Sequence, residues 1–508
     1  MTQVDGRFEM LSRLYADDRP PSALVEMLSE FHRRKISYCY WKGSRRLQAV
    51  FAGEGDVDLL IARADQHRAQ AVLLEQDFKL FPSVADREHP AVLTLLGYDE
   101  KSGRLVHAHL HFRLTIGNGL LKNHRIPWEE ALLARAVFHP TLPIRTLDPT
   151  SDALLLVIRA CLELRRLNPT ALGAWQATTR KFALDRADLV ARVDPSALRA
   201  LAADLLGEEL ADVVTGALYS KRPLERQLAV RRQIRRHCAV YRSYGAVEAG
   251  VRTAGRTLLW IAGYVNKRFL HAPRPWNRRA PGGGCMVAII GVDGSGKSTA
   301  VATIRTWLGS KIDVIPMYFG TGDGRPSLLL LPLKLIQPSI LRIVRRKRKG
   351  GSSTEVREHV PGPLYSVLLM VWAAAVALDK RAKLAAACRG TNRGLVVLTD
   401  RYPQDQIIGF NDGPLLTRLA AAPRLLRQFE SAVYGLARRL PPDLVIKLVV
   451  TPETAARREP QMYLAVIRER VAALQRLQFP GARVVCVDAE RPLPEVIRSI
   501  KREIWQLI

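Results

Sequence analysis

Residues 288–301, AIIGVDGSGKSTAV, carry glycine, lysine and serine at a spacing that can hold a polyphosphate. Gly291, Gly296, Lys297 and Ser298 satisfy the pattern GxxxxGK[ST], after an apolar run and before a helical pattern. The glycines let backbone N–H groups turn toward phosphate oxygens, the lysine adds charge at the outer phosphates, and the serine hydroxyl is a Mg²⁺ ligand. The stretch therefore predicts a site for ATP with Mg²⁺. The predicted ATP-binding loop is completed by Gly294, Ser295 and Thr299.

Two further features narrow the class of this phosphate loop. Asp293 lies inside it, where a carboxylate suits a neutral or hydroxyl-bearing acceptor better than a phosphate, and LTDRYP follows at 398–403. Together they resemble the thymidylate kinase family of P-loop kinases. The resemblance continues to the C-terminus. PDLVIKLVVTPETAARRE (442–459) is similar to the strand, Pro-Glu turn and arginine-bearing lid helix of that family, and VVCVDAERPLPEVIRSIKREI (484–504) to its last strand and closing helix.

This resemblance implies roles for residues after the phosphate loop. Asp400 and Arg401 would lie at the end of a central strand, where an α/β sheet opens its crevice. Asp400 would act near Mg²⁺ or the acceptor, and Arg401 would hold the phosphate of the acceptor. Asp293 and Tyr402 complete the predicted acceptor site.

Phosphoryl transfer also requires positive charge over the transferred group, and an arginine in that role is worth roughly 10³–10⁵ in rate. Positions 292–295 of the loop contain no arginine, so the lid helix must supply it. Arg457 and Arg458 are the predicted catalytic residues, followed by Arg468.

The acceptor is less closely defined than the phosphate donor. YPQDQIIGFNDGP (402–414) lacks the Ser/Ala and Tyr-Gln residues with which the resembled family reads thymine, and YFGTGDGRPS (318–327) stands where its Glu-Pro-Gly-Gly segment is expected. We predict transfer of the γ-phosphoryl group of ATP to a nucleoside monophosphate, similar to dTMP. A sugar or polysaccharide precursor is the alternative acceptor.

A second constellation lies near the start of the chain, in YWKGSRRLQAVFAGEGDVDLLI (40–61). Asp56 and Asp58 share one face of a strand, because residues two apart point the same way, and a two-Mg²⁺ site for nucleotide transfer needs such a pair. Gly43 and Ser44 would form a pocket for the triphosphate. The pattern resembles the nucleotidyltransferase superfamily, and the alternative is a solvated strand with two acids.

A third carboxylate is usual in that superfamily, but LVHAHLHFRL (105–114) has His109 at the corresponding place. His107, His109 and His111 alternate and so line one face, as hydrogen-bonded histidines or as transition-metal ligands. Without the carboxylate, this region could transfer a nucleotide itself or bind a nucleotide or the kinase substrate.

The apolar pattern predicts an α/β chain in several parts. Residues 1–150 form an α+β nucleotidyltransferase-like domain, and 151–270 form a helical region that becomes basic toward its end. Residues 271–284, with three prolines and three consecutive glycines, form a linker. Residues 285–508 form a P-loop parallel sheet flanked by helices, because CMVAIIG, LVVLTD, DLVIKLVV and ARVVCVDA are strands of the type buried on both faces.

Composition indicates a reduced, cytoplasmic globular protein. Six widely spaced cysteines form no CxxC pair, the start of the chain has no secretion signal, and Tyr365–Leu378 is too short to span a membrane and predicts a buried helix.

The net charge of +29 implies acidic partners. Residues 221–280 contain fifteen Lys and Arg against two Glu, and residues 342–349 form a second basic segment. These segments predict a solvated face, an anionic membrane surface or a nucleic-acid surface, so a binding protein that ATP merely switches is the rival to an enzyme.

Overall fold

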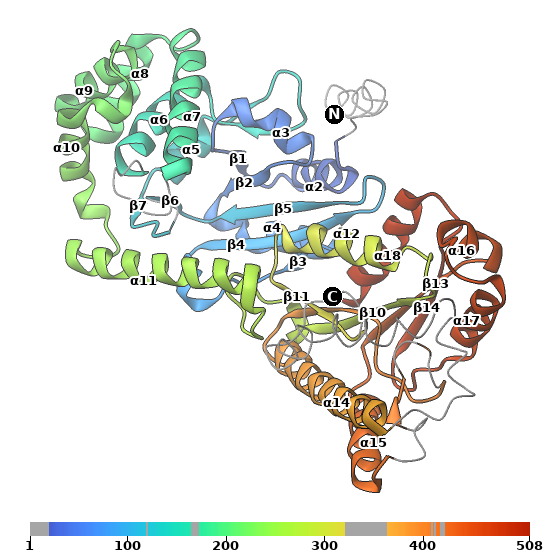
Figure 1. The fold of residues 1–508 in the computed structure, drawn as a ribbon. Helices are drawn as coiled ribbons and strands as arrows, with labels where there is room; N and C mark the ends of the chain where they lie inside the picture. Colours follow the sequence, from blue (N-terminus) through green and yellow to red (C-terminus); the bar gives the residue numbers. More distant parts are fainter. Residues whose placement is uncertain are drawn as a thin grey trace. The chain divides into compact units, whose positions relative to one another are not determined.

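The computed structural model of the chain describes residues 20–117, 120–163, 172–320, 363–407, 410, 413–416 and 422–508. The chain divides into two compact units, residues 1–269 and 270–508 (Figure 1). Each unit has its own sheet, so the predicted mixed α/β class is confirmed. The finer division of the chain into four parts stays a prediction.

A mixed sheet organises unit 1, with strand order β3-β4-β5-β2-β1-β9-β8 in the described residues. β2 pairs parallel with β5 and antiparallel with β1, while β4 and β5 are antiparallel. Its strands are β1 Tyr38–Tyr40, β2 Asp56–Ile61, β3 Lys79–Leu80, β4 Val92–Asp99, β5 Arg104–His111, β8 Val137–Phe138 and β9 Arg145–Thr146. A small hairpin joins β6 Leu114–Ile116 to β7 His124–Ile126. The predicted strands around DVDLLIA and LVHAHLHFRL are thus neighbours.

The helices of unit 1 confirm the helical pattern after residue 150. Its described helices are α2 Ser22–Arg33, α3 Leu47–Phe51, α4 Gln66–Glu75, α5 Glu129–Ala134, α6 Pro149–Glu163, α7 Leu172–Val190, α8 Pro195–Leu206, α9 Glu208–Tyr219, α10 Leu228–His237 and α11 Ala246–Val265. α6 is buried from Ser151 to Leu162. It is the central helix of a cluster to which α7, α8, α9 and α10 contribute buried side chains.

Unit 2 is built on a parallel sheet of order β11-β12-β10-β13-β14 in the described residues. The strands are β10 Cys285–Gly291, β11 Val314–Tyr318, β12 Val396–Asp400, β13 Leu444–Val449 and β14 Arg483–Asp488. Four of them were predicted from apolar runs. β14 differs from its prediction, because it is an edge strand and most of its residues are exposed. β11 was not predicted, and its Pro316 is tolerated because β11 is the other edge.

The described helices of unit 2 flank this sheet. They are α12 Lys297–Gly309, α14 Pro363–Thr391, α15 Arg424–Arg439, α16 Pro452–Arg458, α17 Leu464–Arg476 and α18 Leu493–Leu507. α14 contains the long apolar stretch and confirms that it is helical. The prediction that this stretch is buried holds only in part. Ala373, Ala375, Val376 and Ala377 are buried, whereas Val367, Val371 and Leu378 are exposed.

The Pro/Gly segment 271–284 is part of unit 2 and is held to the rest of that unit by hydrogen bonds. The backbone N–H groups of Trp276 and Asn277 donate to one Asp313 carboxylate oxygen at 2.7 and 2.6 Å, and the N–H of Ala280 donates to the carbonyl of Gly394 at 2.8 Å. These bonds fix a segment that composition alone describes as a linker.

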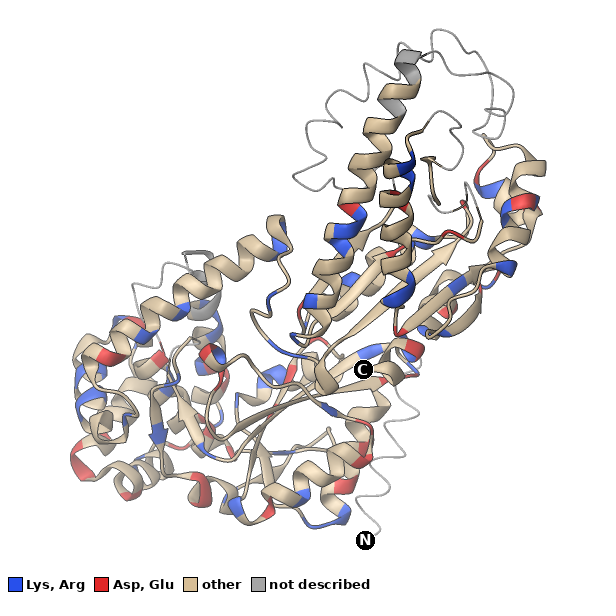
Figure 2. Ribbon diagram, turned by 90° about the horizontal axis from the view of Figure 1, so that it is seen from below, with Lys and Arg blue, Asp and Glu red and all other residues tan. Residues whose placement is uncertain are grey.

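Several arginines of the basic segment 221–280 have structural partners. Arg231 donates to the carbonyl of Glu225 at 3.0 Å, Arg235 to that of Cys161 at 2.8 Å, and Arg256 to that of Leu120 at 2.7 Å. Lys and Arg are interspersed with Asp and Glu on both units (Figure 2). The segment 342–349 lies outside the described residues. An anionic membrane or nucleic-acid partner therefore stays a prediction.

None of the helices that the structure describes combines the length and the apolar character needed to cross a bilayer.

Candidate functional site

The phosphate loop lies at the end of β10, the central strand of unit 2. Gly294 and Gly296 have φ of 78° and 84°, the left-handed region that glycine adopts without strain, and α12 starts at Lys297. A Cβ on Gly294 would lie 2.9 Å from the carbonyl oxygen of Ala455. β10 lies between β12 and β13, so the chain crosses from one side of it to the other, and this switch point is where open α/β sheets bind ligands.

Lys297 points into the loop. Its ammonium donates to the carbonyl oxygen of Val292 at 2.6 Å and lies 3.6 Å from an oxygen of Asp293. Burial lowers the pKa of Lys297, and Arg401 lowers it further, while Asp293 and Asp400 oppose the shift. The lysine is thus a partly desolvated cation, and a phosphate at this place would meet a strong, poorly screened charge.

Among the described residues, three basic side chains lie close to the carboxylate of Asp293. Besides Lys297, a guanidinium nitrogen of Arg401 lies 3.6 Å from one carboxylate oxygen, and Arg470 from α17 forms a close ion pair with the other. One carboxylate among three cations leaves this group with net positive charge. The arrangement is suited to a polyanion, and the structure therefore brings the predicted Asp293, Lys297 and Arg401 together.

Asp400 ends β12 beside the loop, and Arg401 follows it. Oδ1 of Asp400 is buried and has no hydrogen-bond partner among the described residues. Burial raises the pKa of Asp400, although Lys297 and Arg401 act against this shift. Arg401 has φ of 67°, which is uncommon for a residue with a Cβ and marks local strain of the kind often found in binding sites.

The predicted lid arginines differ in their contacts. Arg458 reaches the phosphate loop, donating to the carbonyl oxygen of Gly294 at 3.2 Å and to that of Ala489 at 3.2 Å. Arg457 donates to the hydroxyl of Thr454 at 2.9 Å. Arg468 is 62% exposed and lies 3.5 Å from Glu453. Among the hydrogen bonds and ion pairs of the described residues, Arg458 is the one of these three arginines that reaches the loop.

The remaining predicted residues of unit 2 lie in the loop, in the first turn of α12, or, for Tyr402, against the end of α15. Ser298 and Thr299 are exposed in the first turn of α12, and Ser295 is buried with its hydroxyl oxygen lacking a hydrogen-bond partner in the described residues. The hydroxyl of Tyr402 donates to the carbonyl oxygen of Ala437 at 3.2 Å and also to that of Leu440. The acceptor role of Tyr402 stays a prediction.

Sequence reasoning missed Arg470 and Glu490. The carboxylate of Glu490 accepts hydrogen bonds from the backbone and hydroxyl of Thr451 at 2.6 and 2.9 Å and from the hydroxyl of Thr454 at 2.7 Å, which fixes the start of α16. Arg470 lies 177 residues from Asp293. The arginine-rich sequence after the Pro-Glu turn predicts that some arginine reaches the loop. It does not indicate which of its several arginines does so.

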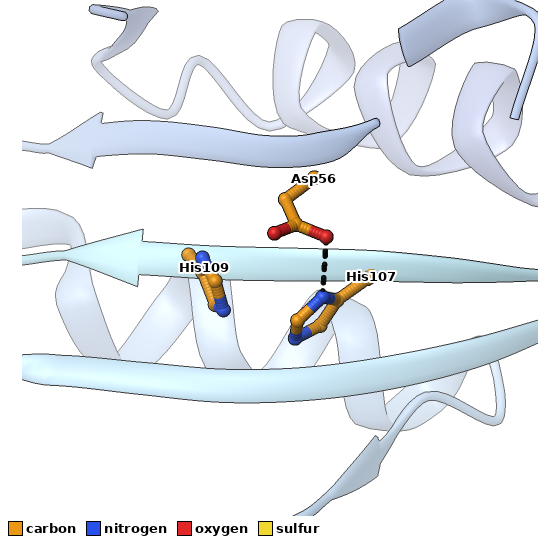
Figure 3. A group of neighbouring side chains, drawn as sticks. All are labelled: Asp56, His107 and His109. Carbon is orange, nitrogen blue, oxygen red and sulfur yellow. Dashed lines mark hydrogen bonds and ion pairs between the residues drawn. The ribbon is translucent and has the colours of Figure 1, made fainter. Parts of the chain in front are cut away.

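Unit 1 brings the second constellation together on neighbouring strands. Nδ1 of His107 lies 2.6 Å from Oδ1 of Asp56 (Figure 3), and Nδ1 of His109 and Nε2 of His111 each lie 3.1 Å from Oδ1 of Asp58. The predicted common face of the three histidines is therefore confirmed. The same oxygen of Asp58 also contacts the ammonium of Lys42 at 2.6 Å, a residue to which the sequence analysis gave no role.

Electrostatics differ across this cluster. Burial raises the pKa of Asp58, but Lys42 and the two histidines outweigh it and hold that pKa well below its usual value. Burial lowers the pKa of His111 to about 3 against the opposing effect of Asp58. Asp58 is thus a buried carboxylate that is already compensated by an ammonium.

The predicted triphosphate pocket of Gly43 and Ser44 contains a carboxylate from α6. The backbone N–H of Ser44 donates to Oδ2 of Asp152 at 3.3 Å, and the carboxylate of Asp185 approaches Gly43. Burial raises the pKa of Asp152 from 3.8 to about 6, while Ser44 and Arg159 oppose this shift. The backbone N–H of Ser44, which would donate to a phosphate, is thus already hydrogen-bonded to the carboxylate of Asp152.

Asp152→Asn is expected to remove part of the pH dependence of the stability of unit 1. The folded-state pKa of Asp152 is raised, so the folded protein favours the protonated form of this carboxyl group. Its contribution to the free energy of unfolding is therefore fully present below the unfolded-state pKa and is lost as the pH rises through about 6. From about pH 5 to about pH 7.5 this group should cost about 1 kcal/mol of unfolding free energy.

Urea unfolding followed by circular dichroism at the two pH values measures this difference. Asp204→Asn, an exposed position on α8, is the matched control and should keep the wild-type pH dependence. Equal pH dependence in Asp152→Asn and the wild type would contradict the prediction.

Two proteins of Escherichia coli strain K12 are similar to this chain. It is 30% identical over 223 residues to the uncharacterized ATP-binding protein YghS, and the match covers 43% of this chain and 92% of YghS. The chain belongs to the YghS family. The uncharacterized ATP-binding protein YghR is 26% identical over 239 residues, covering 46% of this chain and 90% of YghR. More than half of this member of the YghS family therefore lies outside each aligned region. No family profile matches the chain.

Proposed function

We propose that unit 2 is an ATP-dependent phosphotransferase. The observation that carries the proposal is the group of Lys297, Arg401 and Arg470 around Asp293 at the end of the central strand. Such a group can hold a polyphosphate and compensate the charge that develops during phosphoryl transfer. The names of YghS and YghR as ATP-binding proteins support ATP as the donor.

The residues of the loop would divide the work by position. Lys297 and the backbone N–H groups of the glycine-rich turn would hold the outer phosphates, while Arg470 and Arg458 would bring positive charge over the transferred group. The residues also fit Mg²⁺, because the Ser298 hydroxyl is exposed at the start of α12 and Oδ1 of Asp400 has no hydrogen-bond partner within the described chain. When bound there, Mg²⁺ would neutralise phosphate charge.

A nucleoside monophosphate is the first candidate acceptor. Its phosphate would be held by Arg401, which lies at the carboxyl end of β12 next to Asp293. This assignment follows from the resemblance to thymidylate kinases, and the base of the nucleotide stays open.

A hydroxyl of a sugar or polysaccharide precursor is the second candidate acceptor. Two observations favour it. Gln404 donates to the carbonyl oxygens of Ile407 and Phe410 and Gln406 donates to that of Gln478, so these amides are engaged within unit 2 and not available to read a base. The raised pKa of the buried Asp400 also suits a group that takes a proton from a hydroxyl.

Nucleotide transfer by unit 1 has weaker support. A two-Mg²⁺ reaction needs carboxylates that face the ions, whereas Asp58 is paired with Lys42 and Ser44 with Asp152. His109 also stands where the third carboxylate would be.

Labelled ATP separates these possibilities. The protein is incubated with Mg²⁺, nucleoside monophosphates, sugars and sugar phosphates, using ATP labelled on the γ- or the α-phosphate in parallel reactions. We expect the γ-label to appear on one acceptor class and the α-label to remain in ADP. Transfer of the α-label would assign nucleotide transfer instead. ATP binding with no labelled product would favour a nucleotide-dependent switch.

A further inference from the structure

We propose that Asp56, His107 and His109 in unit 1 bind one divalent transition-metal ion, for which Zn²⁺ is the reference. The proposal is independent of phosphoryl transfer in unit 2. It also differs from a two-Mg²⁺ site, because it uses one carboxylate and two imidazoles. Figure 3 shows the three side chains on adjacent strands.

The sheet itself sets the spacing of these residues. Asp56 and His107 are register partners in the parallel pair β2 and β5, and His109 lies two residues further along β5, on the same face. Oδ1 of Asp56 is 2.6 Å from Nδ1 of His107, and donor atoms of all three residues lie within 4.8 Å of one another. Ligands of a tetrahedral Zn²⁺ at about 2.1 Å from the ion are about 3.4 Å apart, so small side-chain rotations would suffice.

The donor types select the class of ion. Imidazole nitrogen suits Zn²⁺, Fe²⁺, Ni²⁺ and Cu²⁺, whereas Mg²⁺ and Ca²⁺ prefer oxygen ligands. Two histidines and one carboxylate also leave at least one coordination position for water or a further ligand. The site thus has the composition of a transition-metal centre that can take an additional ligand.

A second group of similar composition lies beside the first one. In the described residues it consists of Asp58, His109 and His111. Its carboxylate oxygen already contacts the ammonium of Lys42 at 2.6 Å. A cation at Asp58 would have to displace that ammonium. The side chain of Asp58 is also only 7% exposed, against 40% for that of Asp56, so an ion from solvent reaches the Asp56 carboxylate more readily. We therefore place the ion at Asp56, His107 and His109.

Burial is graded across the proposed site. The side chain of His107 is 3% exposed and that of His109 is 16% exposed, while that of Asp56 is 40% exposed. The two imidazoles are therefore held by packing on the sheet, and the carboxylate side is open to solvent. This grading provides an entry path for the ion and a place for an exchangeable ligand.

Metal titration of the full-length protein tests the proposal. The protein is freed of metal with a chelator and titrated with Zn²⁺ by calorimetry, and with Co²⁺, whose visible absorption reports nitrogen and oxygen ligands. We expect one equivalent of either ion, and no displacement of Co²⁺ by an excess of Mg²⁺. Absence of binding, or ready displacement by Mg²⁺, would overturn the proposal.

Variants locate the ion. Asp56→Asn, His107→Gln and His109→Gln should each weaken Zn²⁺ binding by at least about 10²-fold. His67→Gln, an exposed position on α4, should leave binding unchanged. Thermal melting followed by circular dichroism checks that each variant is folded. Because Asp56 is the most exposed of the three ligands, Asp56→Asn should disturb the packing of the sheet least.

His111→Gln distinguishes the two neighbouring groups, because His111 belongs to the Asp58 group alone. It should retain Zn²⁺ binding. Loss of binding in His111→Gln together with full binding in Asp56→Asn would move the ion to the Asp58 group and overturn the assignment.

Discussion

Lys297→Met is expected to reduce ATP turnover by at least about 10²-fold, since removal of one preorganised charge from a transition state typically costs 10²–10³ in rate. The side chain of Lys297 is 7% exposed, and its ammonium donates to the carbonyl oxygen of Val292 in the phosphate loop. Methionine keeps most of the apolar stem. It removes the charge that would lie on the outer phosphates.

The fold should tolerate this change. Lys297→Met loses one hydrogen bond to a carbonyl, worth about 1 kcal/mol, and removes a charge that burial disfavours. Arg305→Met is the matched control, because Arg305 is an exposed cation on the same helix, α12. We expect wild-type turnover in the control and similar melting temperatures in both variants. Unchanged turnover in folded Lys297→Met would remove the phosphotransferase proposal.

The parts of the fold that were predictable are those in which the local pattern agrees with the final burial. β10, β12 and β13 are central strands, covered on both faces, and their Val- and Ile-rich runs therefore identify them. β11 contains Pro316 and lies at an edge, where most of its residues are only partly buried, so its sequence shows little of the pattern. β14 is the opposite case. Its apolar run predicted a strand buried on both faces, but the strand lies at an edge of the sheet and most of its residues are exposed.

The same distinction holds for the candidate sites. Asp293, Lys297 and Asp400 lie at strand ends or in the turn after a strand, and topology alone brings strand ends together. Asp56 and the alternating histidines were likewise placed by the period of a strand. Lys42 could not be assigned in this way, because its contact with Asp58 depends on the antiparallel pairing of β1 and β2.

Contacts made by helices far away in the chain were outside the reach of local patterns. Asp152 meets Ser44 across 108 residues, and nothing in the sequence of α6 distinguishes a helix-start carboxylate from a ligand of a distant backbone N–H. Charge is similarly ambiguous, since Arg231 and Arg235 look like parts of a basic surface and in fact bind carbonyl groups.

Arg470→Met is expected to lower kcat by about 10³-fold, within the range of 10³–10⁵ measured for arginines that stabilise the transferred phosphoryl group. Arg470 is 25% exposed and pairs with Asp293 inside the phosphate loop. Because Arg470 comes from α17 and Lys297 would hold the outer phosphates, the substitution should change the Kd for ATP far less than kcat. Rapid-quench measurement of product formation, with ATP binding measured separately, checks this separation.

Arg468→Met is the matched control, because it removes the same charge from the same helix at a position that does not pair with Asp293 in the described contacts. Arg468 lies on the same helix two residues earlier, but it is 62% exposed and 3.5 Å from the equally exposed Glu453. Such an exposed pair contributes little, so turnover in Arg468→Met should stay close to that of the wild type. Equal losses in both variants would mean that α17 acts through its general positive field, and equal losses in kcat and ATP affinity for Arg470→Met would mean that this arginine binds ATP without assisting transfer.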